Sequence, residues 1–92
     1  MSIPMLEFPK APAAIVPCFI DWSNELAGDT IEESIWVVAA GITKVSDAFS
    51  DTLATIWLSG GQHGQEYQVT NRITSAAGLV DDQSFILEVR QT

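Results

Sequence analysis

The sequence predicts an all-β domain, a sandwich of two antiparallel sheets made from six or seven short strands. Apolar and polar residues alternate along several short segments, most regularly in "EYQVTNRIT" (66–74) and "SFILEVR" (84–90). Glycine- and aspartate-containing turn signals separate these segments at the spacing usual for sandwiches and barrels. No window carries the apolar spacing of an amphipathic helix over a dozen positions. Period-two patterning and frequent turns therefore favour strands throughout.

The strands are expected in six segments, each rich in β-branched or aromatic residues. They are 15–22, 30–38, 42–45, 52–59, 66–74 and 84–90. Turns are expected at Gly28-Asp29, at Gly41 and in "AAGLVDD" (76–82), and "SDAFSD" (46–51) is interpreted as a polar connection. We find no internal repeat and expect a single domain at residues 15–92.

Residues 1–14 form a different kind of segment, and we predict an extended N-terminal arm. Proline fixes φ and removes a backbone donor, and all four prolines lie within residues 1–17, which excludes a helix or a central strand there. The arm is either a disordered leader or a segment that docks on a neighbouring subunit. Met5, Leu6 and Phe8 slightly favour docking, because a solvated tail does not need them.

Charge and size limit the classes of partner. The chain has 92 residues and a net charge of −8, with 12 acidic against 4 basic side chains. This charge repels nucleic-acid backbones and anionic membranes, so we expect neither as a partner. An apolar content of 47% is high for so small a domain and indicates apolar surface meant for another protein.

Cys18 is the only cysteine, which excludes an internal disulfide. We interpret it as a small apolar strand residue, because no histidine lies near it in sequence to activate a thiol. The start of the chain lacks the pattern of a signal peptide, and no apolar run approaches the roughly 18 residues of a membrane span. The protein is expected to be soluble and made in a cytoplasm.

Residues 30–38 contain an irregularity that bears on the surface. Ile31, Ile35 and Val37 share one parity, whereas Trp36 and Val38 share the other. If Trp36 is in the core, Ile35 and Val37 point outward, unless a bulge shifts the register. Ile86 likewise lies opposite the inward residues of the last strand. These apolar side chains form either a partner surface or a face covered by loops or by the arm.

No constellation of residues predicts catalysis, a cofactor or a metal. The glycines of "SGGQHGQ" (59–65) precede a strand-like segment rather than a helix, so we expect positive φ values in a strand connection and not a phosphate site. His63 has no second histidine or cysteine cluster to share a metal with. The loop carboxylates lack the spacing of a calcium loop. No Ser-His-Asp motif is recognisable, so we expect no enzyme.

The three tryptophans leave an alternative function open. A strand tryptophan usually belongs to the core, and we expect this of Trp36. Trp22 and Trp57 are either core residues or exposed platforms on which sugars stack. The second case would make the protein a carbohydrate-binding or adhesion module.

Several segments resemble small virion proteins of tailed phages and prophages, of the fibre–tail adaptor-like family. They are "DWSNELAGDTIEESIWVVAAGIT" (21–43), "ATIWLSGG" (54–61), "GQEYQVTNRIT" (64–74) and "DDQSFILEV" (81–89). The resemblance implies an immunoglobulin-like fold and no catalytic residues. The chain differs at two turns: "VVAAG" lacks a proline, and "GLVDD" lacks an arginine after its glycine.

The resemblance implies a non-enzymatic virion protein, an adaptor-type module that joins tail, fibre or neck components. Its partners are expected to be other virion proteins, with a homo-oligomer as a further possibility. We expect it to be made in a bacterial cytoplasm and built into the virion. The expected partner-interface residues come from the arm and from the two outward-facing strands: Met5, Leu6, Phe8, Ile35, Val37 and Ile86.

Overall fold

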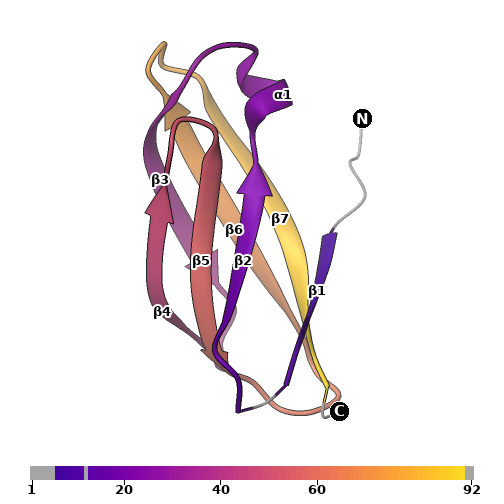
Figure 1. The fold of residues 1–92 in the computed structure, drawn as a ribbon. Helices are drawn as coiled ribbons and strands as arrows, with labels where there is room; N and C mark the ends of the chain where they lie inside the picture. The colour runs from indigo at the N-terminus through magenta and orange to yellow at the C-terminus, as the bar shows by residue number, and fades with distance from the viewer. Residues whose placement is uncertain (1–5, 12, 91–92) are drawn as a thin grey trace.

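A computed structural model describes residues 6–11 and 13–90, with only the backbone of residues 6–9, and shows two β-sheets packed face to face (Figure 1). One sheet has the strand order β1-β7-β6-β3 and the other has the order β2-β5-β4. The elements are β1 Leu6–Lys10, β2 Val16–Asp21, α1 Ser23–Leu26, β3 Ile31–Val38, β4 Ile42–Phe49, β5 Leu53–Gly60, β6 Glu66–Ser75 and β7 Val80–Val89. The prediction of an all-β, sandwich-like fold is confirmed.

Three element boundaries differ from the sequence prediction. β4 continues through "SDAF", where we expected a polar connection, because residues up to Phe49 pair with β5. β7 begins at Val80 rather than at residue 84, since its exposed start pairs with β6. The "SNEL" stretch forms the single-turn helix α1, where we expected only a turn. In the two strands, pairing with an adjacent strand overrides a weak local pattern, whereas α1 is held by its own backbone bonds, such as Leu26 N to Trp22 O at 2.9 Å.

β1 is a strand that the sequence prediction did not include. It pairs in parallel with β7 of the same chain, with Leu6 opposite Phe85 and Lys10 opposite Val89. β1 and β2 are edge strands of their sheets, and they contain Pro9 and Pro17. A proline lacks a backbone donor and is tolerated at an edge, so the expectation that these prolines avoid central strands is confirmed.

The core lies between the two sheets and is made of alternate residues of β2, β5, β6 and β7, with Ile31 and Trp36 from β3 and Ile42 from β4. Cys18 is fully buried in this core, as predicted for an apolar strand residue. Trp36 packs edge-to-face on Phe85, with 6.0 Å between ring centroids. The buried apolar residues are Cys18, Ile20, Trp22, Leu26, Ile31, Trp36, Ile42, Ala54, Ile56, Leu58, Val69, Ile73, Phe85, Leu87 and Val89.

A β-bulge in β3 resolves the parity conflict seen in the sequence. The register of β3 against β6 shifts between Ile31 and Glu33. Ile31 and Trp36 are therefore both buried although their parities differ, because the extra residue turns one half of the strand over. Ile35 and Val37 are 47% and 63% exposed. Their predicted outward orientation is confirmed.

A buried amide connects three parts of the sandwich. Asn71 of β6 has no exposed surface. Its Oδ1 accepts a hydrogen bond from the Trp22 indole at 2.9 Å, and its Nδ2 donates to Ser34 Oγ at 2.9 Å and to the Ile35 carbonyl at 3.1 Å. The amide thus joins β6 to β3 and to the chain just before α1. Each bond is worth more in this dry setting than at the surface.

Asn71→Leu is expected to destabilise the fold by about 2–4 kcal/mol, because it leaves the buried Trp22 N–H and the partly buried Ser34 hydroxyl and Ile35 carbonyl without their partner. Thr74→Val, on the outward face of the same strand, is the control and is expected to change stability by less than about 0.5 kcal/mol. Urea unfolding followed by tryptophan fluorescence measures both. Equal losses of unfolding free energy in the two variants would show that the hydrogen bonds of the Asn71 amide do not stabilise the fold.

The glycines of the β5–β6 connection have the predicted positive φ values. Gly60, Gly61 and Gly64 lie at φ 83°, 94° and 85°. Gly61 is also held in a tight space, since a Cβ there would lie 2.7 Å from Val89 Cγ2 and 2.8 Å from Ile42 Cδ1. A Cβ on Gly64 would meet nothing within 4 Å.

Gly61→Ala is therefore expected to cost about 1–3 kcal/mol more than Gly64→Ala, since both strain the backbone but only the first also overpacks the core. Thermal unfolding of the two variants and the parent protein provides the comparison. Similar losses would mean that the core side chains move aside without cost.

Candidate interaction surfaces

The predicted interface residues of the N-terminal segment are only partly covered by the structure. Met5 lies outside the described residues. Leu6 and Phe8 lie in β1, where their backbones are opposite Phe85 and Leu87 of β7. The segment 6–10 therefore forms a strand in the sheet of its own domain.

The other three predicted residues lie on the outer face of the four-stranded sheet. Ile35 and Val37 of β3 are exposed, whereas Ile86 of β7 is partly buried. β6 runs between them with Gln68 opposite Ile86 and Arg72 opposite Ile35. The structure therefore brings Ile35 and Val37 together and separates both from Ile86 by a strand of polar side chains.

The sequence prediction missed an apolar surface on the opposite face of the sandwich. Phe19 of β2 is 49% exposed, and Trp57 of β5 is partly exposed beside it on the outer face of the three-stranded sheet. A signal was present in the sequence: Cys18, Ile20 and Trp22 share one parity in "CFIDW", so an inward Cys18 places Phe19 outside.

The three tryptophans differ in solvent exposure. Trp22 has no exposed surface and its indole nitrogen is hydrogen-bonded within the core, so it offers no stacking platform. Trp36 is buried in the core, as expected. Trp57 is the tryptophan that reaches the surface.

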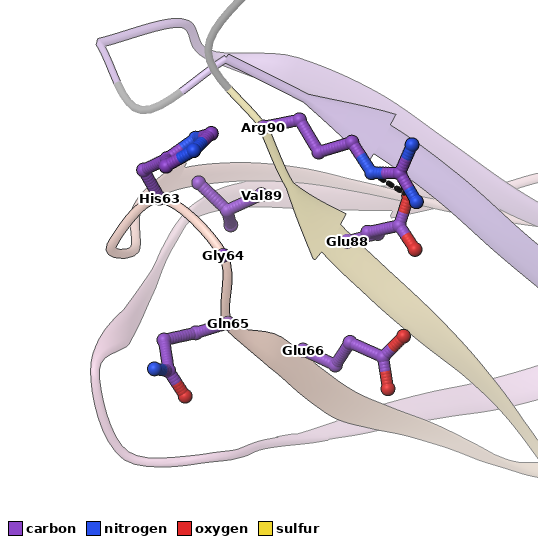
Figure 2. Close-up of a pocket in the computed structure, with 7 residues that line it drawn as sticks. All are labelled: His63, Gly64, Gln65, Glu66, Glu88, Val89 and Arg90. Carbon is purple, nitrogen blue, oxygen red and sulfur yellow. Dashed lines mark ion pairs between the residues drawn. The ribbon is translucent and has the colours of Figure 1, made fainter.

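A hollow of about 600 Å³ opens at the end of the sandwich away from α1. Figure 2 shows its lining from the β5–β6 connection and the end of β7: His63, Gly64, Gln65, Glu66, Glu88, Val89 and Arg90. Glu88 and Arg90 form an ion pair along the last strand, and the labelled side chains spread around the hollow instead of converging. The hollow does not place a nucleophile beside a base, which acyl transfer would require.

Acidic side chains gather at the end of the sandwich that carries α1. They come from the end of β2, from α1 and the loop after it, from the β4–β5 turn and from the starts of β3 and β7: Asp21, Glu25, Asp29, Glu32, Glu33, Asp51, Asp81 and Asp82. Arg72 is the basic residue near this end, and it binds Asp82 with two bonds of 2.8 and 3.0 Å. This end is therefore strongly negative.

Asp29 ties the connections of the acidic end together. Its carboxylate accepts a hydrogen bond from Thr30 N at 2.8 Å. It accepts a second one at 3.3 Å from the backbone N–H of Ala77, which lies in the β6–β7 turn. Backbone hydrogen bonds connect the same loops: Ile31 N donates to the Asp51 carbonyl at 2.8 Å, and Ala76 N donates to the Thr30 carbonyl at 2.9 Å. The Ser75 hydroxyl, then the Thr30 amide and Ala77 amide, lower the pKa of Asp29.

The cysteine and the metal-binding residue types show no reactive arrangement in the part of the chain that the structure describes. Burial raises the pKa of the Cys18 thiol to about 11, so it remains protonated at neutral pH. Among the described residues, no three His, Cys, Asp or Glu side chains are grouped to hold a metal ion. No helix in residues 6–11 and 13–90 is long and apolar enough to cross a membrane.

The fold defines a small β-sandwich module with exposed apolar side chains on its sheet faces. A family model described as "Podophage GP4 fiber-tail adaptor protein gp77" matches residues 10–88, and the chain belongs to this family. The protein is thus a phage structural protein, a fibre–tail adaptor and not an enzyme, as the sequence resemblance predicted. The comparison with curated proteins finds no match.

Family membership also places the protein in the virion, at the connection between fibre and tail components. It decides between the two functions left open by the sequence in favour of the adaptor.

The lowered pKa of Asp29 predicts a pH dependence of stability. A carboxyl group whose pKa is lower in the folded than in the unfolded state stabilises the fold above its unfolded pKa, about 3.9, and this contribution disappears as the pH falls through the folded value. Asp29→Asn is therefore expected to be less stable than the parent protein at neutral pH, with the difference shrinking under acid. Chemical unfolding across this pH range measures it.

Asp51→Asn, at an exposed turn position, is the control for removing one negative charge from the same end. A gap between Asp29→Asn and the parent that persists unchanged at low pH would contradict an ionised, hydrogen-bonded Asp29.

Proposed function

We propose that the adaptor is an immunoglobulin-like module. In the constant-type immunoglobulin fold, strands B, E and D share one sheet and strands C, F and G share the other. The order β2-β5-β4 corresponds to B-E-D, and β3-β6-β7 corresponds to C-F-G. β1 lies beside β7 as an additional parallel strand.

Individual side chains support the same assignment. Immunoglobulin domains bury a tryptophan on strand C, and β3 carries buried Trp36. A tyrosine near the start of strand F bonds back to the upstream backbone, and Tyr67 Oη of β6 accepts a hydrogen bond from Gln62 N at 3.0 Å. Antibody domains place a disulfide between strands B and F. Here fully buried Cys18 of β2 and Val69 of β6 belong to the same core cluster.

The outer face of the four-stranded sheet is proposed to contact a fibre, tail or neck protein. Ile35 and Val37 carry this proposal, because they are neighbouring aliphatic side chains that are 47% and 63% exposed. Burying their apolar surface against a partner is favourable and requires no change in the fold. Ile86 contributes from the same face, and Arg72 between them provides a polar contact. Mixed apolar and charged side chains of this kind are usual at protein interfaces.

The segment 1–14 is proposed to act as an arm, with Met5, Leu6 and Phe8 contacting a neighbouring subunit or another virion protein. The peripheral position of β1 supports this, since an edge strand is exchanged between subunits at low cost. The single cysteine supports synthesis and assembly in a reducing bacterial cytoplasm, where a structural disulfide does not form.

The test is binding of the purified adaptor to the fibre and tail proteins encoded by the same phage, measured by biolayer interferometry. Val37→Glu is expected to weaken binding about tenfold or more, because it buries a charge at the contact. Gln65→Glu makes the same charge change at the exposed β5–β6 connection and is expected to bind like the parent protein. If Val37→Glu binds as tightly as Gln65→Glu, the contact does not involve this face.

A further inference from the structure

β3 ends the four-stranded sheet on the side away from β1, and its outer edge pairs with no other strand in the described part of the chain (Figure 1). At the end of β3, Ala39 N donates to Gln68 O, so these two residues form a hydrogen-bonded pair of the β3–β6 ladder. Hydrogen-bonded pairs alternate along an antiparallel ladder, and the residues between them turn their N–H and C=O groups the other way. The backbone groups of Ser34, Trp36 and Val38 therefore point to the free edge.

Two further hydrogen bonds agree with this alternation. The Ile35 carbonyl faces β6, where it accepts a bond from the Asn71 amide at 3.1 Å. Before the bulge, Ile31 N points to the outer edge and is bonded to Asp51 O at 2.8 Å. The start of β3 is thus closed by the β4–β5 turn, and the open part of the edge runs over residues 34–38.

This stretch lacks the features that protect the other sheet edges. Prolines, lysines and bulges are the devices by which edges avoid adding strands. β1 contains Pro9, β2 contains Pro17, and β4 carries Lys44 and a register shift between Lys44 and Ser46. Residues 34–38, "SIWVV", contain no proline, glycine or charged residue and are rich in β-branched side chains. Their sequence and their open edge favour the addition of a strand.

From this arrangement we propose that a strand of a fibre, tail or neck protein adds to β3 along residues 34–38. The proposal rests on the proposed function for the class of partner and deepens it by naming the mode of contact. An extended backbone presents acceptors and donors at the spacing of those on Ser34, Trp36 and Val38, so the edge selects a β-strand as its occupant. In such strand addition the main-chain hydrogen bonds supply affinity and the side chains supply specificity.

The side chains beside the edge define the sequence of the added strand. Glu33, Ile35 and Val37 share one parity and are exposed. In an antiparallel addition they occupy the non-hydrogen-bonded positions, where opposite side chains come closest. Ile35 and Val37 favour apolar residues opposite them, and Glu33, which forms no ion pair with a described residue, favours lysine or arginine. The added strand is therefore expected to read apolar-x-apolar-x-basic, where x is not proline.

The arm of a second copy is the competing occupant, and it fits less well. Leu6, Phe8 and Lys10 follow the expected order. In that register Pro9 stands opposite Ser34 and has no N–H to donate to its carbonyl. β1 is also already paired with β7 of its own domain, and two chains of net charge −8 repel each other. Another virion protein has none of these disadvantages.

Amide hydrogen exchange of the full chain, alone and bound to the fibre and tail proteins of the same phage, tests the proposal. The amides of Ser34, Trp36 and Val38 are expected to exchange about tenfold or more slowly in the complex, because they acquire partners. Those of Ile35 and Val37 already bond to β6 and are expected to change less. A partner that rests on the outer face alone produces no such alternation along β3.

A proline at the free edge provides a second test. Val38→Pro removes an outward N–H and leaves the β3–β6 ladder intact, so it is expected to weaken binding about tenfold or more in biolayer interferometry. Val38→Ala also shortens the side chain but keeps the N–H, and it is expected to bind like the parent protein. Thermal unfolding of both variants verifies that they fold.

The outcomes separate strand addition from the proposed function. If Val37→Glu weakens binding while Val38→Pro binds as tightly as Val38→Ala, and β3 shows no alternate protection, the outer face is the contact and strand addition is overturned. If no fibre or tail protein binds the parent chain, both proposals are overturned. Alternate protection that appears in the adaptor alone as its concentration rises would assign the edge to a second copy and overturn the choice of partner.

Discussion

The buried amide of Asn71 is the interaction on which the rest of the architecture depends. Its hydrogen bonds hold the Trp22 indole on one side and Ser34 and the Ile35 carbonyl on the other. A buried polar group must keep all its partners, so these bonds set the position of the chain before α1 and the register of β3 together. The register decides that Trp36 points inward and Ile35 and Val37 outward. One core residue is thus bonded to the part of β3 whose register brings Ile35 and Val37 to the surface.

Charge is distributed so that the surfaces differ in character. Carboxylates gather around α1 and the adjoining turns, whereas Lys10, Lys44 and Arg90 lie toward the opposite end. Between the ends, the sandwich has one outer face with mixed charged and apolar residues and one with almost no charge. The two faces point in opposite directions because they belong to different sheets. An adaptor holds at least two neighbours at once, and two faces of different character are consistent with that role.

Local patterns predicted most of the strands, and their failures have a common cause. The alternation in residues 66–74 and 84–90 identified β6 and most of β7, because one face of each is buried. "SDAF" and residues 80–83 have no such contrast, since β4 and the start of β7 are exposed, and only pairing to β5 and β6 makes them strands. The strand β1 is supported in the same way by β7 alone. The alternation in β2 places Phe19 on the face opposite to Cys18. The sequence prediction missed that Phe19 is exposed, because this conclusion requires knowing that Cys18 points into the core.

The sequence by itself determined the all-β class, the inward Trp36, the positive-φ glycines and, through its resemblance to the fibre–tail adaptors, the biological role. These follow from alternation, from residue-specific backbone preferences and from motifs, all of which are local. Only the tertiary structure decided that Trp22 is sealed in the core by Asn71, that a bulge near Glu32 buries Ile31 as well as Trp36, and that Lys44 and Asp47 leave the outer face of their sheet uncharged. Those outcomes depend on pairing between strands distant in the chain, and a local pattern does not contain them.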